Sequence, residues 1–434
     1  MERAIQKDLL IWKNKPHRLP LILQGARQVG KTYIMKWLGS HHYQKHIYLN
    51  FDEQPEIKEF FTTNKQVNRI IELLSLIGGT PIDENTLIIL DEIQECPQAL
   101  NTLKYFAENR PEISIICAGS LLGILLNKGN SFPVGKVEFL TLHPMTFREV
   151  LPYWDETAAK YLETHNSFEK IPELFFNSIL YQFKKYLIIG GMPAAITLFN
   201  QTNLFEESDQ LLKNLLLSYQ GDFAKHPIMS DIAKITQVFE SLPSQLSREN
   251  KKFVFQLVRD GARAREFEDA IQWLVNSGLV HRIHLNTKPA LPLSAYDQVN
   301  AFKLYCFDVG LIRRMSTLSP KVLGEGNRLF TEFKGALTEN FILQSLITQF
   351  QEQPRYWTSG NSAEVDFLIT YENLIIPIEV KSDQNVKSRS LTLFRNHYQP
   401  PLSIRYSLQN LEKRDGLLNI PLFMADYTKD KLSQ

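Results

Sequence analysis

Short apolar runs alternate with helical stretches over the first 150 residues. The runs lie at Leu19–Leu23, Ile47–Phe51, Leu87–Leu90, Ile113–Ala118 and Val137–Leu142. Strands that alternate with helices are typical of a parallel sheet covered by helices. The pattern predicts an α/β fold with a parallel-sheet domain over residues 1–150.

The pattern changes to helical spacing after about Pro152. Phe, Leu and Tyr recur at helical intervals as far as His226, with one sharp break at Gly190–Pro193. Apolar residues at this period predict amphipathic helices, and the Gly-Pro cluster predicts an interruption. We expect a helical connector or lid over residues 151–230.

Residues 231–325 show a helix-turn-helix pattern followed by strands. The expected elements are a helix at Lys252–Asp260, a turn at Gly261, a helix ending at Val275, and strands at Leu279–Leu285 and Phe302–Phe307. This order predicts a winged helix.

Residues 326–434 are expected to form a separate α/β unit. It opens with a helix at Thr331–Phe350 and continues with strands Val365–Ile369 and Leu374–Val380 around the turn Tyr371–Asn373. The polar segment Gly324–Asn327 is the expected linker to the preceding domain.

Composition supports a folded, multidomain protein. A chain of 434 residues suggests about three domains of roughly 150 residues each. With 44% hydrophobic and 22% charged residues, it lacks the composition of disordered chains. The net charge of +1 means that any nucleic-acid surface must come from local clusters of Lys and Arg.

Cysteine usage and the amino terminus indicate the compartment. Cys96, Cys117 and Cys306 are widely separated, which predicts neither a disulfide framework nor a zinc site. The amino terminus carries charges where a secretory signal needs apolar residues, and no apolar run reaches the about 18 residues of a membrane span. We expect a cytoplasmic protein without membrane contacts.

A complete phosphate-binding loop (P-loop, Walker A) follows the first predicted strand. The sequence Gly25-Ala-Arg-Gln-Val-Gly-Lys-Thr32 lies between that strand and a helix. Gly25 and Gly30 allow the backbone to turn N–H groups inward around phosphates. Lys31 should reach the β- and γ-phosphates, and the hydroxyl of Thr32 should bind Mg²⁺. The pattern predicts ATP binding.

Two adjacent acids end the third predicted strand, Thr86–Leu90. Asp91 would complete the Mg²⁺ site, and Glu92 would orient and deprotonate the attacking water. Solvated acids at a strand end are the alternative interpretation. Ser120, after the fourth strand, could contact the γ-phosphate or simply belong to a turn.

The residues expected to bind nucleotide are Gly25, Ala26, Arg27, Gln28, Val29, Gly30, Lys31, Thr32, Tyr33, Asp91 and Ser120. The transition state also requires positive charge. Arg27, Arg110 and Arg148 are candidates for it, and an arginine supplied by a second copy of the chain or another partner stays open.

The carboxy-terminal hairpin carries a second set of charged residues. Asp366 lies on its first strand, and Glu379 and Lys381 lie on one face of the second. Metal-dependent nucleases use this arrangement, in which two acids hold Mg²⁺ and the lysine positions the nucleophile or stabilises phosphoryl charge. A surface ion pair or an inactive fold is the alternative.

Spacing alone does not establish this second site. The same Glu-x-Lys spacing recurs at Glu56–Lys58, Glu249–Lys251 and Glu332–Lys334. Only the copy at Glu379 lies in an apolar strand behind a second acid-bearing strand. Pro377 cannot donate a ladder hydrogen bond, which predicts an edge position or a bulge beside the site.

Three arginines surround the turn of the expected winged helix. Arg259, Arg263 and Arg265 suit phosphate contacts at the start of a recognition helix. The acids that follow, Glu266, Glu268 and Asp269, would repel DNA. A DNA-binding and a purely structural winged helix both remain open.

The whole chain resembles a group of bacterial and archaeal AAA-type ATPases that join a P-loop domain to a winged helix and a restriction-endonuclease-like domain. The resemblance rests on Gly25–Thr32, Leu90–Gln94, Ala118–Ser120, Pro133–Lys136, Leu304–Leu311, Gly335–Phe341, Glu364–Leu368 and Pro377–Ser382. It implies ATP and Mg²⁺ as cofactors and a nuclease-like metal site at Glu339, Asp366 and Glu379 with Lys381. Relatives often carry arginine where this chain has Lys136, which lacks the planar fork of arginine.

The resulting hypothesis is a Mg²⁺-dependent ATPase whose nucleotide state controls a nuclease-like domain that acts on or binds DNA or RNA. The expected catalytic residues are Lys31, Glu92 and Lys381. The competing hypothesis is a signal-transducing ATPase switch that binds a protein partner and cleaves nothing.

Overall fold

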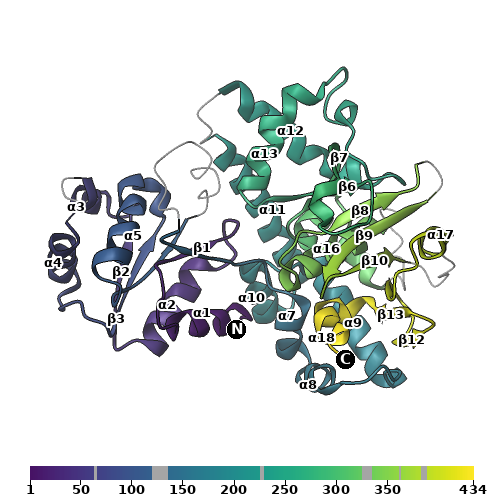
Figure 1. The fold of residues 1–434 in the computed structure, drawn as a ribbon, viewed down its shortest axis with the longest axis horizontal. Coiled ribbons are helices and arrows are strands. Elements are labelled where there is room, and N and C mark those ends of the chain that lie inside the picture. Colours follow the sequence, from purple (N-terminus) through teal and green to yellow (C-terminus); the bar gives the residue numbers. More distant parts are fainter. Residues whose placement is uncertain (63–65, 120–134, 225–228, 325–334, 361–362, 383–388) are drawn as a thin grey trace. The chain divides into compact units, whose positions relative to one another are not determined.

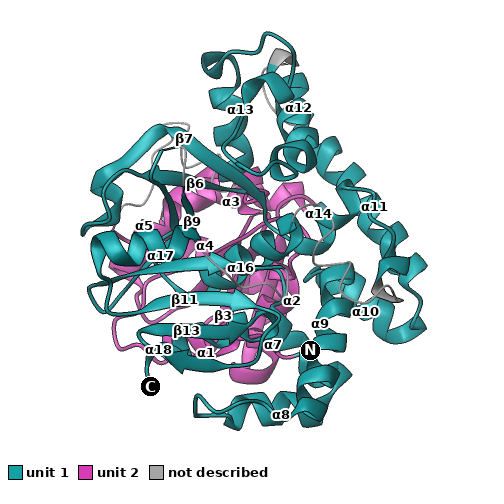
Figure 2. Ribbon diagram, turned by 90° about the vertical axis from the view of Figure 1, so that its right-hand side faces the viewer, with its two compact units in different colours: residues 1, 144–275, 280–434 teal, residues 2–143, 276–279 magenta. Residues whose placement is uncertain are grey.

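The computed structural model describes residues 1–62, 66–119, 135–224, 229–324, 335–360, 363–382 and 389–434. These residues form two compact units, which Figure 2 colours separately. The amino-terminal unit comprises residues 2–143 and 276–279, and the carboxy-terminal unit comprises residues 1, 144–275 and 280–434. The expected boundaries near residues 150, 230 and 325 stay a prediction.

A parallel five-stranded sheet forms the centre of the amino-terminal unit (Figure 1). Its strands are β1 (Leu21–Gln24), β2 (Lys45–Asn50), β3 (Thr86–Asp91), β4 (Ser114–Ala118) and β5 (Glu138–Thr141). Their order is β2-β3-β4-β1-β5, and every pairing is parallel. The predicted parallel sheet is confirmed. All strands end at the same edge, where the sequence motifs lie.

Amphipathic helices bury this sheet. They are α1 (Ile5–Lys13), α2 (Lys31–His42), α3 (Lys58–Thr62), α4 (Val67–Gly78) and α5 (Pro97–Asn109), with 3-10 turns η1 (Pro55–Ile57) and η2 (Ile93–Glu95). In α4 the buried residues Val67, Ile70, Ile71 and Leu74 repeat at helical spacing. They join one core cluster with the buried Ile47 of β2 and residues of β3 and β4.

The predicted helical middle region is confirmed. It contains α7 (Phe147–Trp154), α8 (Glu156–Thr164), α9 (Glu173–Ile189), α10 (Pro193–Thr202), α11 (Phe205–Phe223) and α12 (Met229–Leu246). The chain breaks between α9 and α10, where Gly190 has φ +79°. A Cβ at Gly190 would lie 2.4 Å from a carboxylate oxygen of Asp308, so only glycine fits there.

The prediction of a helix at Lys252–Asp260 is wrong. The structure has only the 3-10 turn η3 (Phe255–Leu257) there. The amide of Phe253 donates to the carbonyl of Phe302, and the side chain of Gln245 bonds both the N–H and the C=O of Val254. These groups are therefore not available for helical hydrogen bonds. The following helix, α13 (Ala264–Asn276), agrees with the prediction.

A mixed eight-stranded sheet forms the rest of the carboxy-terminal unit. Its strands are β6 (Val280–Asn286), β7 (Asp297–Cys306), β8 (Arg355–Thr358), β9 (Glu364–Tyr371), β10 (Leu374–Val380), β11 (Ser403–Ser407), β12 (Glu412–Arg414) and β13 (Leu417–Pro421). The order is β12-β13-β11-β10-β9-β8-β6-β7. The β6–β7 pair, which the sequence assigns to a winged helix, thus continues the carboxy-terminal sheet through β8.

Helices and 3-10 turns connect these strands. They are α14 (Val309–Met315), α16 (Ala336–Gln349), α17 (Arg389–Tyr398), α18 (Thr428–Leu432), η4 (Leu293–Tyr296), η5 (Pro320–Gly324) and η7 (Leu422–Tyr427). The described part of the expected helix at residues 331–350 is α16, which is buried from Ala336 to Leu346.

The predicted hairpin is present, although Pro377 does not lie on an edge strand. Glu372 and Asn373 have φ of 47° and 64°, as the two central residues of a type I′ turn require. Strand β10 has neighbours on both sides, β9 and β11. Its pairing with β11 begins at Ile378, one residue after Pro377, so the missing N–H falls outside that ladder.

A buried asparagine ties α16 to the end of β7. Asn340 accepts a hydrogen bond from the amide of Cys306 and donates one to its carbonyl, each at 2.9 Å. Each group would otherwise be buried without a partner. We expect Asn340→Ala to lower the free energy of unfolding by about 2–4 kcal/mol, since each orphaned group costs about 1–3 kcal/mol.

Denaturant unfolding would measure this change. The exposed Asn396→Ala on α17 is the control, expected to stay within about 0.5 kcal/mol of the wild type. Equal stability of Asn340→Ala and Asn396→Ala would contradict the structural role of Asn340.

Candidate functional site

The backbone between β1 and α2 adopts the shape of a phosphate-binding loop. Gly25, Gln28 and Gly30 have φ of 145°, 69° and 99°. A Cβ at Gly25 would lie 2.3 Å from the carbonyl oxygen of Leu142, so this position requires glycine. Gly30 immediately precedes the first turn of α2, whose amide groups favour negative charge.

Lys31 folds back into the loop. Its Nζ donates to the carbonyl oxygens of Gly25 at 2.9 Å and Ala26 at 2.8 Å. Burial lowers the pKa of Lys31 to about 8, although the charges of Glu92 and Asp91 oppose this shift. The ammonium is therefore held by two carbonyl oxygens and pairs with no carboxylate among the described residues, as suits a group that recognises phosphate.

The carboxylate of Asp91 joins three elements at the sheet edge. Its Oδ2 accepts hydrogen bonds from the hydroxyls of Thr32 at 2.5 Å and Tyr48 at 3.1 Å. Thr32 begins α2, and Tyr48 lies on β2 beside β3. Burial, then the charge of Asp91, raises the pKa of Tyr48, which stays a neutral donor. The two oxygens expected to bind Mg²⁺ thus lie together.

Glu92 follows Asp91 in a left-handed conformation, with φ of 50°. Its amide donates to Asp91 Oδ1 at 3.0 Å, and Gln94 Nε2 donates to its carboxylate. The tight turn directs the chain from β3 into η2 and places the second acid beside the first. This position agrees with a role in orienting water, which stays a prediction.

Arg3 fixes the backbone of the phosphate-binding loop by hydrogen bonds. Its guanidinium donates to the carbonyl oxygen of Val29 at 3.1 Å and to that of His143 at 2.7 Å. Arg3 is buried. Sequence reasoning missed Arg3 and Tyr48, because both act through residues distant in sequence and neither belongs to a motif.

The three candidate arginines occupy different places. Arg27 lies in the loop and lowers the pKa of Lys31 by its charge. Arg110 precedes β4 and pairs with Glu112, at the sheet edge opposite the loop. Arg148 belongs to the carboxy-terminal unit and bonds Glu163 and Asp430 with all three guanidinium nitrogens.

The remaining expected nucleotide contacts are less informative. Tyr33 is 58% exposed on α2. Lys136 pairs with Glu108 at 3.0 Å. Ser120 lies outside the described residues.

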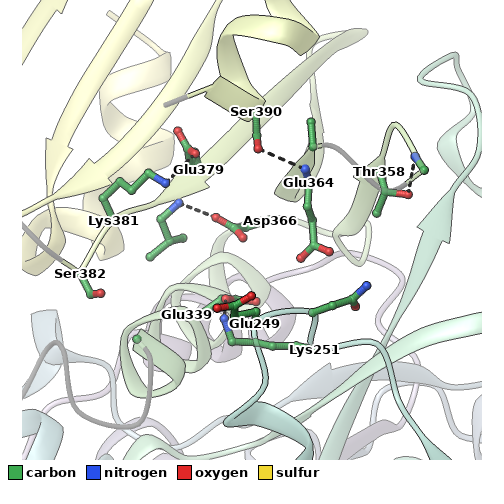
Figure 3. Close-up of a pocket in the computed structure, with 15 residues that line it drawn as sticks. Glu249, Lys251, Glu339, Thr358, Glu364, Asp366, Glu379, Lys381, Ser382 and Ser390 are labelled. Carbon is green, nitrogen blue, oxygen red and sulfur yellow. Dashed lines mark hydrogen bonds and ion pairs between the residues drawn. The ribbon is translucent and has the colours of Figure 1, made fainter. Parts of the chain in front are cut away.

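Charged side chains from two strands and a helix line a cavity of about 680 Å³ in the carboxy-terminal unit (Figure 3). The β9–β10 register pairs Ile378 with Phe367, which places Glu379 opposite Asp366. The Oδ2 of Asp366 accepts a hydrogen bond from the amide of Val380 at 2.7 Å. The Nζ of Lys381 lies 3.0 Å from Oε1 of Glu379. The structure therefore brings Asp366, Glu379 and Lys381 together on one face of the sheet.

Glu339, on α16, also lines this cavity, but its oxygens are engaged. Oε2 accepts from Lys251, and Oε1 accepts from Lys303 and from the hydroxyl of Tyr305. Burial opposes ionisation of Glu339, but the two lysines hold its pKa at about 2. Glu339 is therefore a carboxylate paired with two lysines, and its role as a metal ligand stays a prediction.

Lys303 is the buried centre of this ion-pair network. It lies on β7, is fully buried, and donates to Glu364 at 2.5 Å as well as to Glu339. Burial lowers its pKa, but the carboxylates of Glu339 and Glu364 outweigh burial and raise the pKa above the usual value. By contrast, burial and the charge of Glu339 raise the pKa of Asp366 to about 7.

Sequence reasoning missed the lysines and tyrosine around Glu339. A signal for Lys303 was present, because it is the single charge in the apolar run Ala301–Phe307. Lys251 was noted as part of a Glu-x-Lys spacing, yet it lies outside any predicted strand. Only the fold shows that it reaches the cavity.

Two carboxylates of the cavity fit a divalent metal ion. Within the described residues, the buried Oε2 of Glu379 has no hydrogen-bond partner. Glu379 lines the same cavity as Asp366, and Mg²⁺ is often held by one or two carboxylates and several waters. The described residues contain no group of three or more His, Cys, Asp or Glu arranged around a metal position. Asp366 and Glu379 therefore stay predicted metal ligands.

The arginines of the expected DNA-reading helix lie near acids that are already paired. Arg259 bonds Glu266 at 2.8 Å, and Arg282 of β6 bonds Glu268 at 2.5 Å. Arg263 and Arg265 are exposed. DNA contact at these residues stays a prediction.

Comparison with known families assigns the amino-terminal part. Residues 17–151 match the AAA domain family. The amino-terminal unit is an AAA-family P-loop ATPase domain. Residues 180–322 and 334–423 match two domains of unknown function, DUF8612 and DUF4143. No curated protein matches the chain. AAA domains generally use ATP and Mg²⁺, in agreement with the Thr32–Asp91 geometry.

Solved structures give only distant likenesses. A Walker-type ATPase of Pyrococcus abyssi is 14% identical, with a TM-score of 0.46, over 72% of this chain and 95% of that chain. A Drosophila ORC structure bound to DNA is 11% identical, with a TM-score of 0.29, over 74% and 95%. Cdc6p of Pyrobaculum aerophilum is 12% identical, with a TM-score of 0.26, over 74% and 92%. At such TM-scores, these likenesses carry no functional argument.

No helix among the described residues is long and apolar enough to cross a membrane.

The pKa of Lys31 predicts proton uptake on ATP binding. Near pH 8 about half of the Lys31 side chains are neutral in the free protein, and phosphate charge in the complex favours the ammonium. We expect uptake of about half a proton per ATP at pH 8 and about a tenth at pH 7, so affinity falls as pH rises above 8.

Calorimetric titrations in buffers of different ionisation enthalpy would measure this uptake. Equal proton uptake at pH 7 and pH 8, or proton release at pH 8, would contradict the lowered pKa of Lys31.

Proposed function

We propose that this chain is a Mg²⁺-dependent ATPase whose nucleotide state controls a phosphodiester-cleaving site in its carboxy-terminal cavity. The observation that carries the nuclease half is that Glu379, whose buried Oε2 has no hydrogen-bond partner among the described residues, lines one cavity with Asp366 and Lys381. The AAA domain match and the Thr32–Asp91 contact support the ATPase half.

The ATPase site would work by positioning and electrostatics. Lys31 would exchange its two carbonyl partners for phosphate oxygens, and Thr32 and Asp91 would hold the ion. Bound Mg²⁺ neutralises charge between the β- and γ-phosphates. Tyr48 and Arg3 would fix Asp91 and the loop backbone, while Glu92 would accept the proton of the attacking water.

The cavity residues would cleave a phosphodiester bond of DNA or RNA. Asp366 and Glu379 would hold the ion, and the amide of Val380 fixes one oxygen of Asp366. A bound Mg²⁺ would lower the pKa of water and polarise a phosphoryl oxygen. Lys381 would place its ammonium beside the developing phosphoryl charge. Arg405 of β11 lies in register with Glu379 of β10 and adds positive charge near the end of these strands.

A switch without nuclease activity is the second candidate. The observation that favours it is the engagement of both Glu339 oxygens by lysines and a phenol, which leaves two carboxylates for a metal ion. In this case the two domains of unknown function would bind a protein partner in response to ATP.

Separation of the two activities tests the proposal. Lys31→Ala should lower ATP hydrolysis by about 100-fold or more, since it removes charge stabilisation of the transferred phosphoryl group. Asp366→Asn and Glu379→Gln should remove cleavage of single- and double-stranded DNA and RNA with Mg²⁺ or Mn²⁺, while ATPase rates stay within about twofold.

Lys252→Met, an exposed change near the cavity segment, is the matched control and should preserve both activities. Wild-type protein that hydrolyses ATP but cleaves no nucleic acid, with or without ATP, would favour the switch.

A further inference from the structure

Two Glu-x-Lys segments line the same cavity. Glu379–Lys381 ends β10, and Glu249–Lys251 lies in the segment between α12 and η3. Figure 3 shows Lys251 and Glu339 on one side of Asp366, and Glu379 and Lys381 on the other. The second segment is therefore part of the site, although no sequence signal distinguished it from the copies elsewhere.

The segment that carries Lys251 is fixed in place. Phe253 bonds the carbonyl of Phe302 on β7, and Gln245 of α12 bonds both backbone groups of Val254. The side chain of Lys251 is 10% exposed and that of Glu339 is 4% exposed. Their ion pair is thus a built contact inside the cavity, unlike a pair of mobile surface charges.

The contact gives each oxygen of Glu339 a lysine donor. Lys303 and Tyr305 engage Oε1, and Lys251 is the donor to Oε2. Without Lys251, Oε2 of Glu339 would lack this donor, and Glu339 lines the cavity that Asp366 and Glu379 also line. A divalent cation is the species that satisfies two or more carboxylate oxygens at once.

We propose that Lys251 is a built-in cation that takes the place of a metal ion at Glu339, and so keeps this carboxylate out of the metal site. This inference rests on the proposed metal site at Asp366 and Glu379. Lys251 thereby sets the number of anionic ligands, which together with site rigidity determines the affinity of oxygen-ligand sites for divalent ions.

Lys303 cannot take over the proposed role of Lys251 at the cavity. Lys303 is fully buried and bonds Glu364 as well as the other oxygen of Glu339. Its single ammonium already forms ion pairs with two carboxylates, those of Glu364 and Glu339. Lys251 is the one of the two that lines the cavity, so its removal opens Glu339 toward Asp366.

Calorimetric Mn²⁺ titration of the full chain tests this inference. All proteins carry Asp91→Asn, which removes the carboxylate expected to bind the ion at the ATP site. Lys251→Met should bind Mn²⁺ at least about tenfold more tightly than the Asp91→Asn parent, because a third carboxylate joins the ligands. The exposed neighbour change Lys252→Met should leave the dissociation constant unchanged.

Two further variants identify the ligands. Asp366→Asn should weaken Mn²⁺ binding in the parent and in Lys251→Met. Glu339→Gln should leave the parent unchanged and should abolish the gain in Lys251→Met. If thermal melting shows that Lys251→Met does not fold, Glu339→Gln in the parent still decides, since weaker binding there would make Glu339 a ligand despite Lys251.

The outcomes separate the two proposals. Equal dissociation constants for the parent and a folded Lys251→Met, with both dependent on Asp366, would overturn the role of Lys251 and keep the metal site. Absence of Asp366-dependent binding from every variant would overturn both proposals.

Discussion

The buried carboxylate of Glu339 constrains the arrangement of the carboxy-terminal unit. A charge on α16 that is almost fully buried must be paired, and removal of one partner of such a pair typically costs about 3–5 kcal/mol. Its partners come from β7 and from the segment after α12. One carboxylate therefore fixes three parts of the chain around the cavity, and Asn340 reinforces the link to β7 on the next residue.

The same constraint determines what chemistry is left for the cavity. Lys303 pairs with Glu364 as well as Glu339, so two of the acids are committed to lysines. Asp366 and Glu379 are the carboxylates that we propose as metal ligands, with Lys381 beside Glu379. In the AAA domain, too, hydrogen bonds hold charged side chains in place. There Asp91 accepts hydrogen bonds from Thr32 and Tyr48. Lys31 donates to carbonyl oxygens of its own loop, which we propose that phosphate oxygens replace.

Local signals in the sequence predicted much of the fold. Apolar runs that alternate with helical stretches predicted the parallel sheet, and the P-loop and Asp91 follow from short motifs with defined neighbours. The hairpin around Glu372 and Asn373 was recognisable because its turn separates two apolar runs. These features depend on residues close in sequence, where periodicity and turn chemistry are informative.

Features that depend on distant contacts were not predictable. The segment at Lys252–Asp260 has helix-like spacing, yet Gln245 and Phe302 take its backbone hydrogen bonds. Pro377 suggested an edge strand, but β11 pairs only beyond it. Tyr48, Lys251 and Lys303 reach their carboxylates across 43, 88 and 36 residues of sequence. Their roles follow from tertiary structure alone.

Anomalous diffraction from a Mn²⁺-soaked crystal of the full chain is the most direct test of this account. We expect one ion in the carboxy-terminal cavity, ligated by Asp366 and Glu379, while Lys251 remains bonded to Glu339. An ion ligated by Glu339 with Lys251 displaced, or a cavity without an anomalous peak at saturating Mn²⁺, would contradict it.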